Sequence, residues 1–365
     1  MKRVLHVVGA RPNFMKVAPI MSAMAKYPQD FAQVLVHTGQ HYDAKMSRVF
    51  FDEFELPRPE VNLEVGSGSH AWQTAQVMLR FEPVLRDDKP DCVMVVGDVN
   101  STLACALVAS KLGISVAHVE AGLRSFDRTM PEEINRLLTD QIADLLFTPS
   151  LDANENLLRE GITPEKIHFV GNVMIDILVR LAPKAEQRWP RLSARLGCDR
   201  YVLVTLHRPF NVDDSHTLTD IMAALTEISR EILVLFPVHP RTHQRIADAS
   251  LQPLTRNLQL IEPLGYLDFL ALQTHADLVL TNSGGVQEGT TYLGVPCLTV
   301  RHNTERPITV TVGTNRLVEG RRDQLMAAAH TALNDRTKRT TALELWDGLA
   351  AQRLTQAIAC FKTIA

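Results

Sequence analysis

The strongest constraint on the fold is a regular alternation of short apolar runs with amphipathic helical patterns along nearly the whole chain. In the first half the apolar runs lie at 3–8, 32–38, 91–97, 114–120, 145–150 and 167–171. Runs of this length between helical patterns are typical of βαβ units, in which parallel strands form a sheet covered by helices on both faces. A second series of the same kind follows at 201–207, 231–239, 258–263, 276–282 and 296–300.

The interval between the two series, 173–199, is helical and charged, which predicts a connection between two domains. We expect an N-terminal domain at 1–172 and a C-terminal domain at 173–349. The last stretch, about 350–365, has helical apolar spacing and is a candidate to pack back on the first domain. The predicted fold is therefore α/β, with two doubly wound, Rossmann-like domains. Such sheets bind ligands beyond the carboxyl ends of their strands, so we expect the domains to face a shared cleft.

Composition excludes several classes of partner. A net charge of −3 and a pI near 6.5 over 365 residues leave no basic footprint for nucleic acid or an acidic membrane. The five cysteines are scattered and never occur as CxxC, and no His, Cys and Asp cluster has the spacing of metal ligands, so we expect neither disulfides nor a metal. No segment is apolar enough to span a membrane and no signal-peptide layout is present, which indicates a cytoplasmic protein.

A candidate phosphate site lies at Ser283-Gly284-Gly285, directly after the apolar run that ends near Thr281. A turn from a strand into a helix presents unpaired N–H groups and the positive end of the helix dipole, and glycines let an anion approach the backbone. A bare SGG by itself favours an ordinary tight turn over a phosphate site. Arg306, after the next apolar run, favours the functional interpretation because it supplies a second contact for an anion.

Other polar residues also follow predicted strands. Arg11 and Lys16 begin the first helical pattern and form a cation pair suited to a diphosphate, although a lysine on a helix surface is often merely solvated. Asp98 and Glu120 each end an apolar run, where a carboxylate loses water unless it faces a site. His207 has the same position after the first strand of the second series.

The pair Glu132 and Glu133 follows Pro131 at the start of a predicted helix. Acidic residues in a first helical turn stabilise the helix dipole whatever the function, so this pair carries a weaker signal than the strand-end residues. One of the two remains a candidate for the site.

Nine motifs occur in a fixed order over nearly the whole chain: GARPNFMKVAP, GDVNSTLA, HVEAGLRS, PEEINR, GNVMID, LHRPFN, PVHP, NSGGVQE and NTERP. Together they resemble the non-hydrolysing UDP-N-acetylglucosamine 2-epimerases. The resemblance implies a glycosyltransferase-B-like fold, a homodimer, no cofactor, and interconversion of UDP-N-acetylglucosamine and UDP-N-acetylmannosamine. It also implies a mechanism in which UDP is eliminated to leave a 2-acetamidoglucal and is then added back.

The resemblance implies roles for particular residues, position by position. The positions that match the catalytic set are Asp98, Glu120, Glu132 and His207. Those that match the UDP-binding set are Arg11, Lys16, Phe269, Ser283, Gly284, Gly285, Glu288 and Arg306. In regulated members a second UDP-N-acetylglucosamine binds as an activator, at positions that match Gln40, His41, Arg208 and His239.

Three positions depart from the family's pattern, each by loss of a glutamate: Asn13 beside the phosphate loop, Phe210 in the activator region and Gly289 near the ribose. Four alternatives stay open. They are a 2-epimerase of a related UDP-sugar such as a 2,3-diacetamido uronate, a hydrolysing 2-epimerase, a glycosyltransferase of the same fold, and a regulator that binds nucleotide sugars without turnover.

Overall fold

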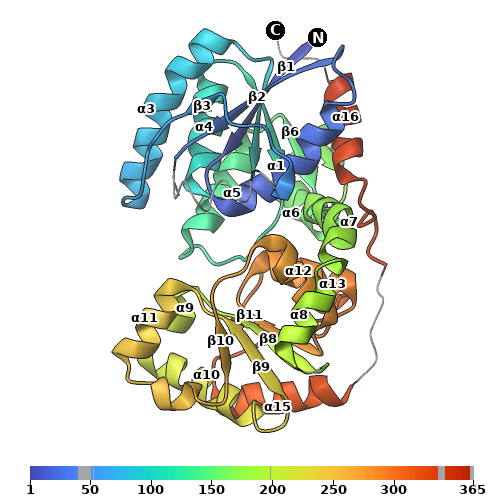
Figure 1. Cartoon of the computed structure of the whole chain (residues 1–365). Helices are drawn as coiled ribbons and strands as arrows, with labels where there is room; N and C mark the ends of the chain where they lie inside the picture. The colour runs from blue at the N-terminus through green and yellow to red at the C-terminus, as the bar shows by residue number, and fades with distance from the viewer. Residues whose placement is uncertain (40–50, 52, 198, 336–341, 362–365) are drawn as a thin grey trace. The chain divides into compact units, whose positions relative to one another are not determined.

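The computed structural model describes residues 1–39, 51, 53–197, 199–335 and 342–361 (Figure 1). The chain forms two units. Unit 1 comprises Met1–Ile177 and Glu344–Ala365, and unit 2 comprises Leu178–Leu343. The change from unit 1 to unit 2 therefore falls inside helix α7 (Val173–Glu186), a few residues after the boundary expected at 172.

Unit 1 contains a parallel sheet of seven strands within the described residues, in the order β3-β2-β1-β4-β5-β6-β7. The strands are β1 (Lys2–Val8), β2 (Phe31–His37), β3 (Val61–Asn62), β4 (Cys92–Val96), β5 (Ser115–Val119), β6 (Leu145–Thr148) and β7 (Ile167–Phe169). β1 pairs in parallel with both β2 and β4. The chain thus winds outward from β1 in both directions, and the gap between the carboxyl ends of β1 and β4 is the switch point where such sheets bind ligands.

Helices cover both faces of this sheet (Figure 1). They are α1 (Arg11–Met24), α3 (His70–Asp88), α4 (Asn100–Lys111), α5 (Pro131–Ile142) and α6 (Leu151–Arg159), with a 3₁₀ turn at Pro164–Lys166. One core forms where Phe81 of α3 and Ala104 of α4 pack on Val95 and Leu146 of the sheet. The strands are apolar on both faces because both faces are covered.

The C-terminal segment returns to unit 1 as α16 (Ala350–Cys360), which packs against α1. Asp176 of α7 accepts the N–H groups of Ala350 (3.1 Å) and Ala351 (2.7 Å), so a carboxylate occupies the positive end of the returning helix. Just before the helix, Trp346 donates its indole N–H to the carbonyl of Pro149 (2.9 Å). These contacts attach the end of the chain to the first sheet.

Unit 2 repeats the architecture. Its sheet has six parallel strands in the described part of the chain, in the order β10-β9-β8-β11-β12-β13. They are β8 (Tyr201–Thr205), β9 (Leu233–Pro237), β10 (Gln259–Ile261), β11 (Leu278–Thr281), β12 (Cys297–Val300) and β13 (Asn315–Val318). The helices are α8 (Trp189–Leu196), α9 (Pro209–Val212), α10 (Ser215–Ile228), α11 (Pro240–Asp248), α12 (Tyr266–His275), α13 (Gly284–Leu293), α14 (Ile308–Thr311) and α15 (Arg322–Asn334), with a 3₁₀ turn at Gln252–Thr255.

The core of unit 2 lies where α10 and α15 cover the sheet, with Ile221, Phe236 and Leu325 among its members. The predicted doubly wound α/β fold is confirmed in both units. Two strands, β3 and β13, were not predicted. No helix among the described residues is long and apolar enough to cross a membrane.

The predicted strands are present, but several end earlier than their apolar runs. β4 ends at Val96, β5 at Val119 and β8 at Thr205. Gly97, Glu120 and His207 therefore lie in the turns beyond the sheet, where side chains can be directed by turn geometry instead of by the pleat. This places them at the carboxyl edge of their sheets.

Candidate active-site residues

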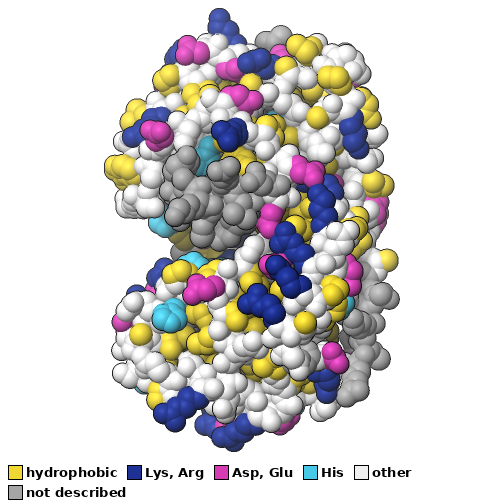
Figure 2. Space-filling model, viewed as in Figure 1, with side chains coloured by type: hydrophobic (Ala, Val, Ile, Leu, Met, Phe, Trp, Pro, Cys, Tyr) yellow, Lys and Arg dark blue, Asp and Glu magenta, His cyan; other side chains and the backbone are white. Residues whose placement is uncertain are grey.

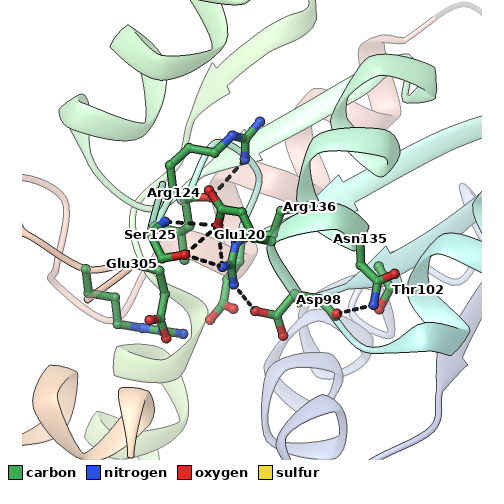
Figure 3. Close-up of polar contacts among 12 residues, drawn as sticks. Asp98, Thr102, Glu120, Arg124, Ser125, Asn135, Arg136 and Glu305 are labelled. Carbon is green, nitrogen blue, oxygen red and sulfur yellow. Dashed lines mark hydrogen bonds and ion pairs between the residues drawn. The ribbon is translucent and has the colours of Figure 1, made fainter. Parts of the chain in front are cut away.

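The turn after β4 is held by side chains from three different elements. The carbonyls of Val96, Gly97 and Asp98 accept hydrogen bonds from Asn13 of α1 (2.9 Å), His118 of β5 (2.8 Å) and Asn135 of α5 (2.9 Å), respectively. Because three successive carbonyls each accept a hydrogen bond from a side chain, the backbone that carries the Asp98 side chain is fixed. Figure 3 shows Asn135 directed at this turn.

The carboxylate of Asp98 forms an ion pair with Arg136 (Figure 3). Arg136 is also paired with Glu133, one turn earlier in α5. Glu133 is fully buried and accepts the N–H groups of Ser125 (3.0 Å) and Phe126 (2.9 Å). Burial alone would raise the pKa of Glu133, but these N–H groups and Arg136 outweigh it and lower the pKa. The fixed carboxylate of Glu133 therefore binds one side of the Arg136 guanidinium, and Asp98 binds the other side.

Lys16 and Glu120 form a second ion pair in unit 1, with both side chains buried. Glu120 has φ 67°, a left-handed conformation that is unfavourable for a glutamate and marks a constrained position. Gly97 lies beside the pair, because a Cβ there would come within 2.7 Å of the lysine Nζ and 3.9 Å of Glu120 Oε2. The sequence predicted Lys16 and Glu120 as separate candidates, and the structure brings them into contact.

Asn13 stands where the family pattern has a glutamate, and its hydrogen bonds show how unit 1 accommodates this difference. Its Oδ1 accepts the N–H groups of Gly9 (3.1 Å) and Ala10 (2.8 Å), while its Nδ2 donates to Val96. An ionised glutamate can only accept, so the amide supplies one contact that a carboxylate cannot. Arg11 is the first residue of α1, immediately after this turn.

The two glutamates of PEEINR are now distinguished. Glu133 is the buried residue that anchors Ser125, Phe126 and Arg136, whereas Glu132 is partly exposed in the first turn of α5. The sequence named Glu132 and Glu133 as a pair without separating their roles, and it missed Arg136 and His118. The spacing of Glu133 and Arg136, three residues apart on one helix face, was the available signal for a structural pair.

In unit 2, α13 begins at Gly284 with Ser283 as its N-cap, as the sequence predicted. The N–H of Ser283 is taken by Thr281 Oγ1 (3.0 Å), and the serine side chain makes no capping hydrogen bond. A Cβ on Gly284 would overlap the guanidinium of Arg306 and lie 2.9 Å from Glu305 Oε1. Arg306 therefore packs directly against the first turn of the helix, which is possible because residue 284 has no side chain.

Arg306 belongs to a buried cluster of charges at this helix start. Its Nε is 2.8 Å from Glu288 Oε1, and its Nη1 is paired with Glu305. Glu305 also contacts Arg301 (2.8 Å) and lies 4.0 Å from Arg208. Burial would raise the pKa of Glu305, but the surrounding arginines lower it well below its ordinary value. Arg301 and Glu305 were not predicted, because charged residues close together in a sequence are typical of a solvent-exposed surface.

The turn after β8 carries His207 and Arg208. With its amide oxygen facing this turn, the buried Asn282 accepts the N–H groups of both residues (3.2 and 3.1 Å). The ring of His207 lies 6.2 Å from that of His239. Although the residue as a whole is exposed, loss of water around the ring lowers the pKa of His207 to about 4, and the charges of Arg208 and His239 contribute.

Phe269 lies in the first turns of α12, partly exposed. The residue before it, Asp268, is paired with Arg188 (3.0 Å) and Arg191 (3.4 Å) near α8, and Figure 2 shows Lys and Arg side chains gathered over this region.

Gly289 of α13 stands where the family pattern has a glutamate. A Cβ at this position would come within 2.7 Å of Nε2 of Gln273, so an amide from α12 occupies the adjacent space.

Of the predicted activator positions, Gln40 and His41 lie outside the described residues. Arg208 and His239 lie at the ends of β8 and β9. Phe210, which stands where the family has a glutamate, packs edge-on against His302 with ring centroids 4.9 Å apart. Within the described residues, no group of three or more His, Cys, Asp or Glu side chains could hold a metal ion.

Two Rossmann-type units, one with fixed carboxylates and the other with an arginine-lined helix start, define a nucleotide-binding α/β enzyme of the glycosyltransferase-B-like class. Comparison with known proteins narrows this class. The family model described as UDP-N-acetylglucosamine 2-epimerase matches residues 23–359. The chain belongs to the UDP-N-acetylglucosamine 2-epimerase family, a family of isomerases, and the predicted family is confirmed.

Two relatives and one solved structure illustrate the similarity. The UDP-N-acetylglucosamine 2-epimerase of Methanocaldococcus jannaschii is 45% identical over 358 residues, which cover 96% of this chain and 97% of the relative. The UDP-2,3-diacetamido-2,3-dideoxy-D-glucuronate 2-epimerase of Pseudomonas aeruginosa is 43% identical, covering 91% and 92%. The crystal structure of the M. jannaschii enzyme in complex with UDP-GlcNAc and UDP superposes with a TM-score of 0.91 at 43% identity, covering 98% and 99%.

Proposed function

We propose that this enzyme interconverts UDP-N-acetylglucosamine and UDP-N-acetylmannosamine without net hydrolysis. The observation that carries the proposal is that each unit holds a different set of chemical groups beyond the ends of its strands. Unit 1 holds Asp98 and Glu120 in fixed backbone turns, and unit 2 packs Arg306 against the N-terminus of α13. Carboxylates suit proton transfer at carbon, and the arginine-lined helix start suits a diphosphate leaving group.

Epimerisation at C2 needs more than simple deprotonation, because this carbon bears an amide nitrogen and is not next to a carbonyl. Elimination avoids the difficulty: a base removes the C2 proton, the C1–O bond to UDP breaks, and a 2-acetamidoglucal remains. UDP then adds back to C1 while C2 is protonated from the opposite face. Proton count and charge are restored at the end of the cycle, so the reaction consumes no cofactor.

In this scheme the diphosphate binds at Ser283, Gly284 and Gly285 with Arg306, where developing negative charge meets N–H groups and a guanidinium. Glu288, which is 2.8 Å from Arg306, orients that guanidinium and helps hold the nucleotide. Phe269 offers a ring face to the uracil. Arg11 and Lys16 add positive charge to the phosphates at the start of α1.

Asp98, Glu120 and Glu132 are the proposed proton donors and acceptors on the two faces of C2. Asp98 is held by Arg136, and Glu120 by Lys16, so two carboxylates of different surroundings are available for opposite roles. His207 is neutral before substrate binds, because its pKa is lowered to about 4. An incoming diphosphate favours the protonated ring, so His207 takes up a proton as the β-phosphate binds.

A second substrate is favoured by the 43% identity to the P. aeruginosa enzyme, whose name specifies a 2,3-diacetamido glucuronate. The same elimination applies to that sugar, but its C5 carboxylate requires an additional cation. A panel containing both UDP-sugars at equal concentration distinguishes the candidates through kcat/KM.

The test is NMR spectroscopy of UDP-N-acetylglucosamine with the pure protein in D2O. Deuterium at C2 together with appearance of the manno epimer is the expected result. Release of free N-acetylmannosamine would identify a hydrolysing enzyme. If UDP binds but C2 does not exchange, the remaining candidates are a glycosyltransferase and a regulator that binds nucleotide sugars without turnover.

The assembly and regulation follow from family membership as further expectations. A cytoplasmic homodimer is proposed, and sedimentation velocity of the purified chain measures its stoichiometry. Activation by a second UDP-N-acetylglucosamine at Gln40, His41, Arg208 and His239 predicts a sigmoidal rate curve. Phe210 cannot supply the carboxylate that this site has in regulated members, so hyperbolic kinetics would indicate that activation is lost.

A further inference from the structure

Two histidines on strands of the first sheet are fully buried: His6 on β1 and His118 on β5. Their surroundings differ. His6 has one side-chain partner, Gln33 Oε1 at 3.0 Å, and burial lowers its pKa to about 4. It is therefore an uncharged histidine at neutral pH. His118 has an acceptor at each ring nitrogen.

The contacts of His118 hold its ring at both nitrogens. Nε2 lies 2.8 Å from the carbonyl oxygen of Gly97, and because a carbonyl can only accept, this nitrogen carries a hydrogen. Nδ1 lies 2.6 Å from Oδ1 of Asp140. Burial would raise the pKa of Asp140, but His118 and Arg124 outweigh it and lower the pKa.

Asp140 belongs to a buried network of charges. It also pairs with Arg124 (2.7 Å), and Arg124 pairs with Glu160 (2.6 Å). Such pairing is the condition under which buried charges are tolerated. The other oxygen of Asp140 accepts the N–H of Gly122 at 3.0 Å.

We propose that His118 is a positioning residue whose ring, held by Asp140, fixes the turn that carries Asp98. The ring donates to Gly97, and its partner Asp140 receives Gly122, so the dyad connects the turns after β4 and β5. In the sequence, Glu120 lies between His118 and Gly122, and its backbone has the left-handed conformation. A charge-assisted hydrogen bond is shorter and stronger than a neutral one, which suits a turn that must not move during proton transfer.

The positioning role is tested by His118→Gln, with His6→Gln as the matched buried control. We expect amide hydrogen exchange of the peptide containing Asp98 to accelerate at least tenfold in His118→Gln and to stay within twofold in His6→Gln. This readout does not depend on the reaction.

The catalytic consequence rests on the proposed function. For His118→Gln we expect kcat to fall about 100-fold, with KM and the Kd of UDP changed less than threefold. A folded His118→Gln variant with kcat and amide exchange equal to those of the unaltered protein would refute positioning. If the unaltered protein epimerises no UDP-sugar, the proposed function fails, and the amide-exchange result still decides the inference about His118.

Discussion

The six described strands of unit 2 follow the order of the first six strands of unit 1, yet the charge clusters beyond their strand ends differ in which sign is in excess. In unit 1, Lys16 and Arg136 face three carboxylates, those of Asp98, Glu120 and Glu133. The corresponding cluster of unit 2 places three arginines against two carboxylates, listed by position as Arg208, Arg301 and Arg306 with Glu288 and Glu305. One fold therefore supports a cluster with more carboxylates than cations in unit 1 and a cluster with more cations than carboxylates in unit 2.

The difference also appears in how each unit holds its turns. In unit 1 side-chain donors such as Asn13, His118 and Asn135 bind backbone carbonyls, which leaves the adjacent carboxylates directed by fixed turns. In unit 2 the acceptor Asn282 binds the N–H groups of the turn after β8, and the N–H groups at the start of α13 are available to an anion. The comparison teaches that strand-end chemistry is set by the loops and not by the sheet.

The largest expected effect comes from Asp98→Asn in unit 1. Loss of a proton-transfer group should lower kcat about 10³-fold, while the Kd of UDP stays within about threefold because Asp98 is assigned no contact with the nucleotide. Deuterium exchange at C2 and calorimetric titration of UDP measure the two quantities. Retained exchange in Asp98→Asn would remove this residue from the mechanism and weaken the assignment of chemistry to unit 1.

The next largest effect distinguishes the role of Glu133 from that of Glu132. Glu133→Gln leaves Arg136 with one partner fewer in a buried position and should lower the free energy of unfolding by about 3 kcal/mol. Glu132→Gln, the control on the same helical turn, should leave thermal stability nearly unchanged and lower kcat. Chemical denaturation and kcat measurements on both variants suffice. Equal stability of the two variants would contradict the structural role of Glu133.

A smaller effect is expected in unit 2 from Gly284→Ala. The added Cβ overlaps the guanidinium of Arg306, so the affinity for UDP should fall about 30-fold, or about 2 kcal/mol. In an Arg306→Lys background the same substitution should cost clearly less, because the overlapping group is gone. Additive losses of affinity in this double-mutant cycle would show that Gly284 and Arg306 act independently.

The smallest effect concerns pH and the uncharged histidine of unit 1. The pKa of His6 is lowered from 6.5 to about 4, so the unfolded chain binds more protons than the folded one between these values. The stability is fully present above pH 6.5 and is lost as pH falls toward 4, by about 1 kcal/mol at pH 5.5. Denaturation of His6→Gln should show a correspondingly weaker decline over this window. An unchanged slope would assign the acid sensitivity elsewhere, with His207 of unit 2 as the next group to replace.

Much of the fold was readable from the sequence because buried parallel strands are continuous apolar runs. The runs that became β4, β5 and β11 could be assigned without any partner in view. β3 has two residues and β13 follows a glycine and threonine turn, so neither produced a run long enough to detect. The helix start at Ser283 and Gly284 was also predictable, since it depends on local turn chemistry.

Sequence by itself determined the alternation of strands and helices, the strand-end position of Asp98, Glu120 and Arg306, and membership of the family through an ordered set of motifs. Tertiary structure decided which charges meet. Lys16 reaches Glu120 across 104 positions of the chain, and His118 meets Asp140 and Gly97 from separate elements. Pairings between distant positions follow from how strands order themselves in a sheet, which local periodicity does not encode. The charge of a buried side chain depends on those pairings, because water no longer sets it.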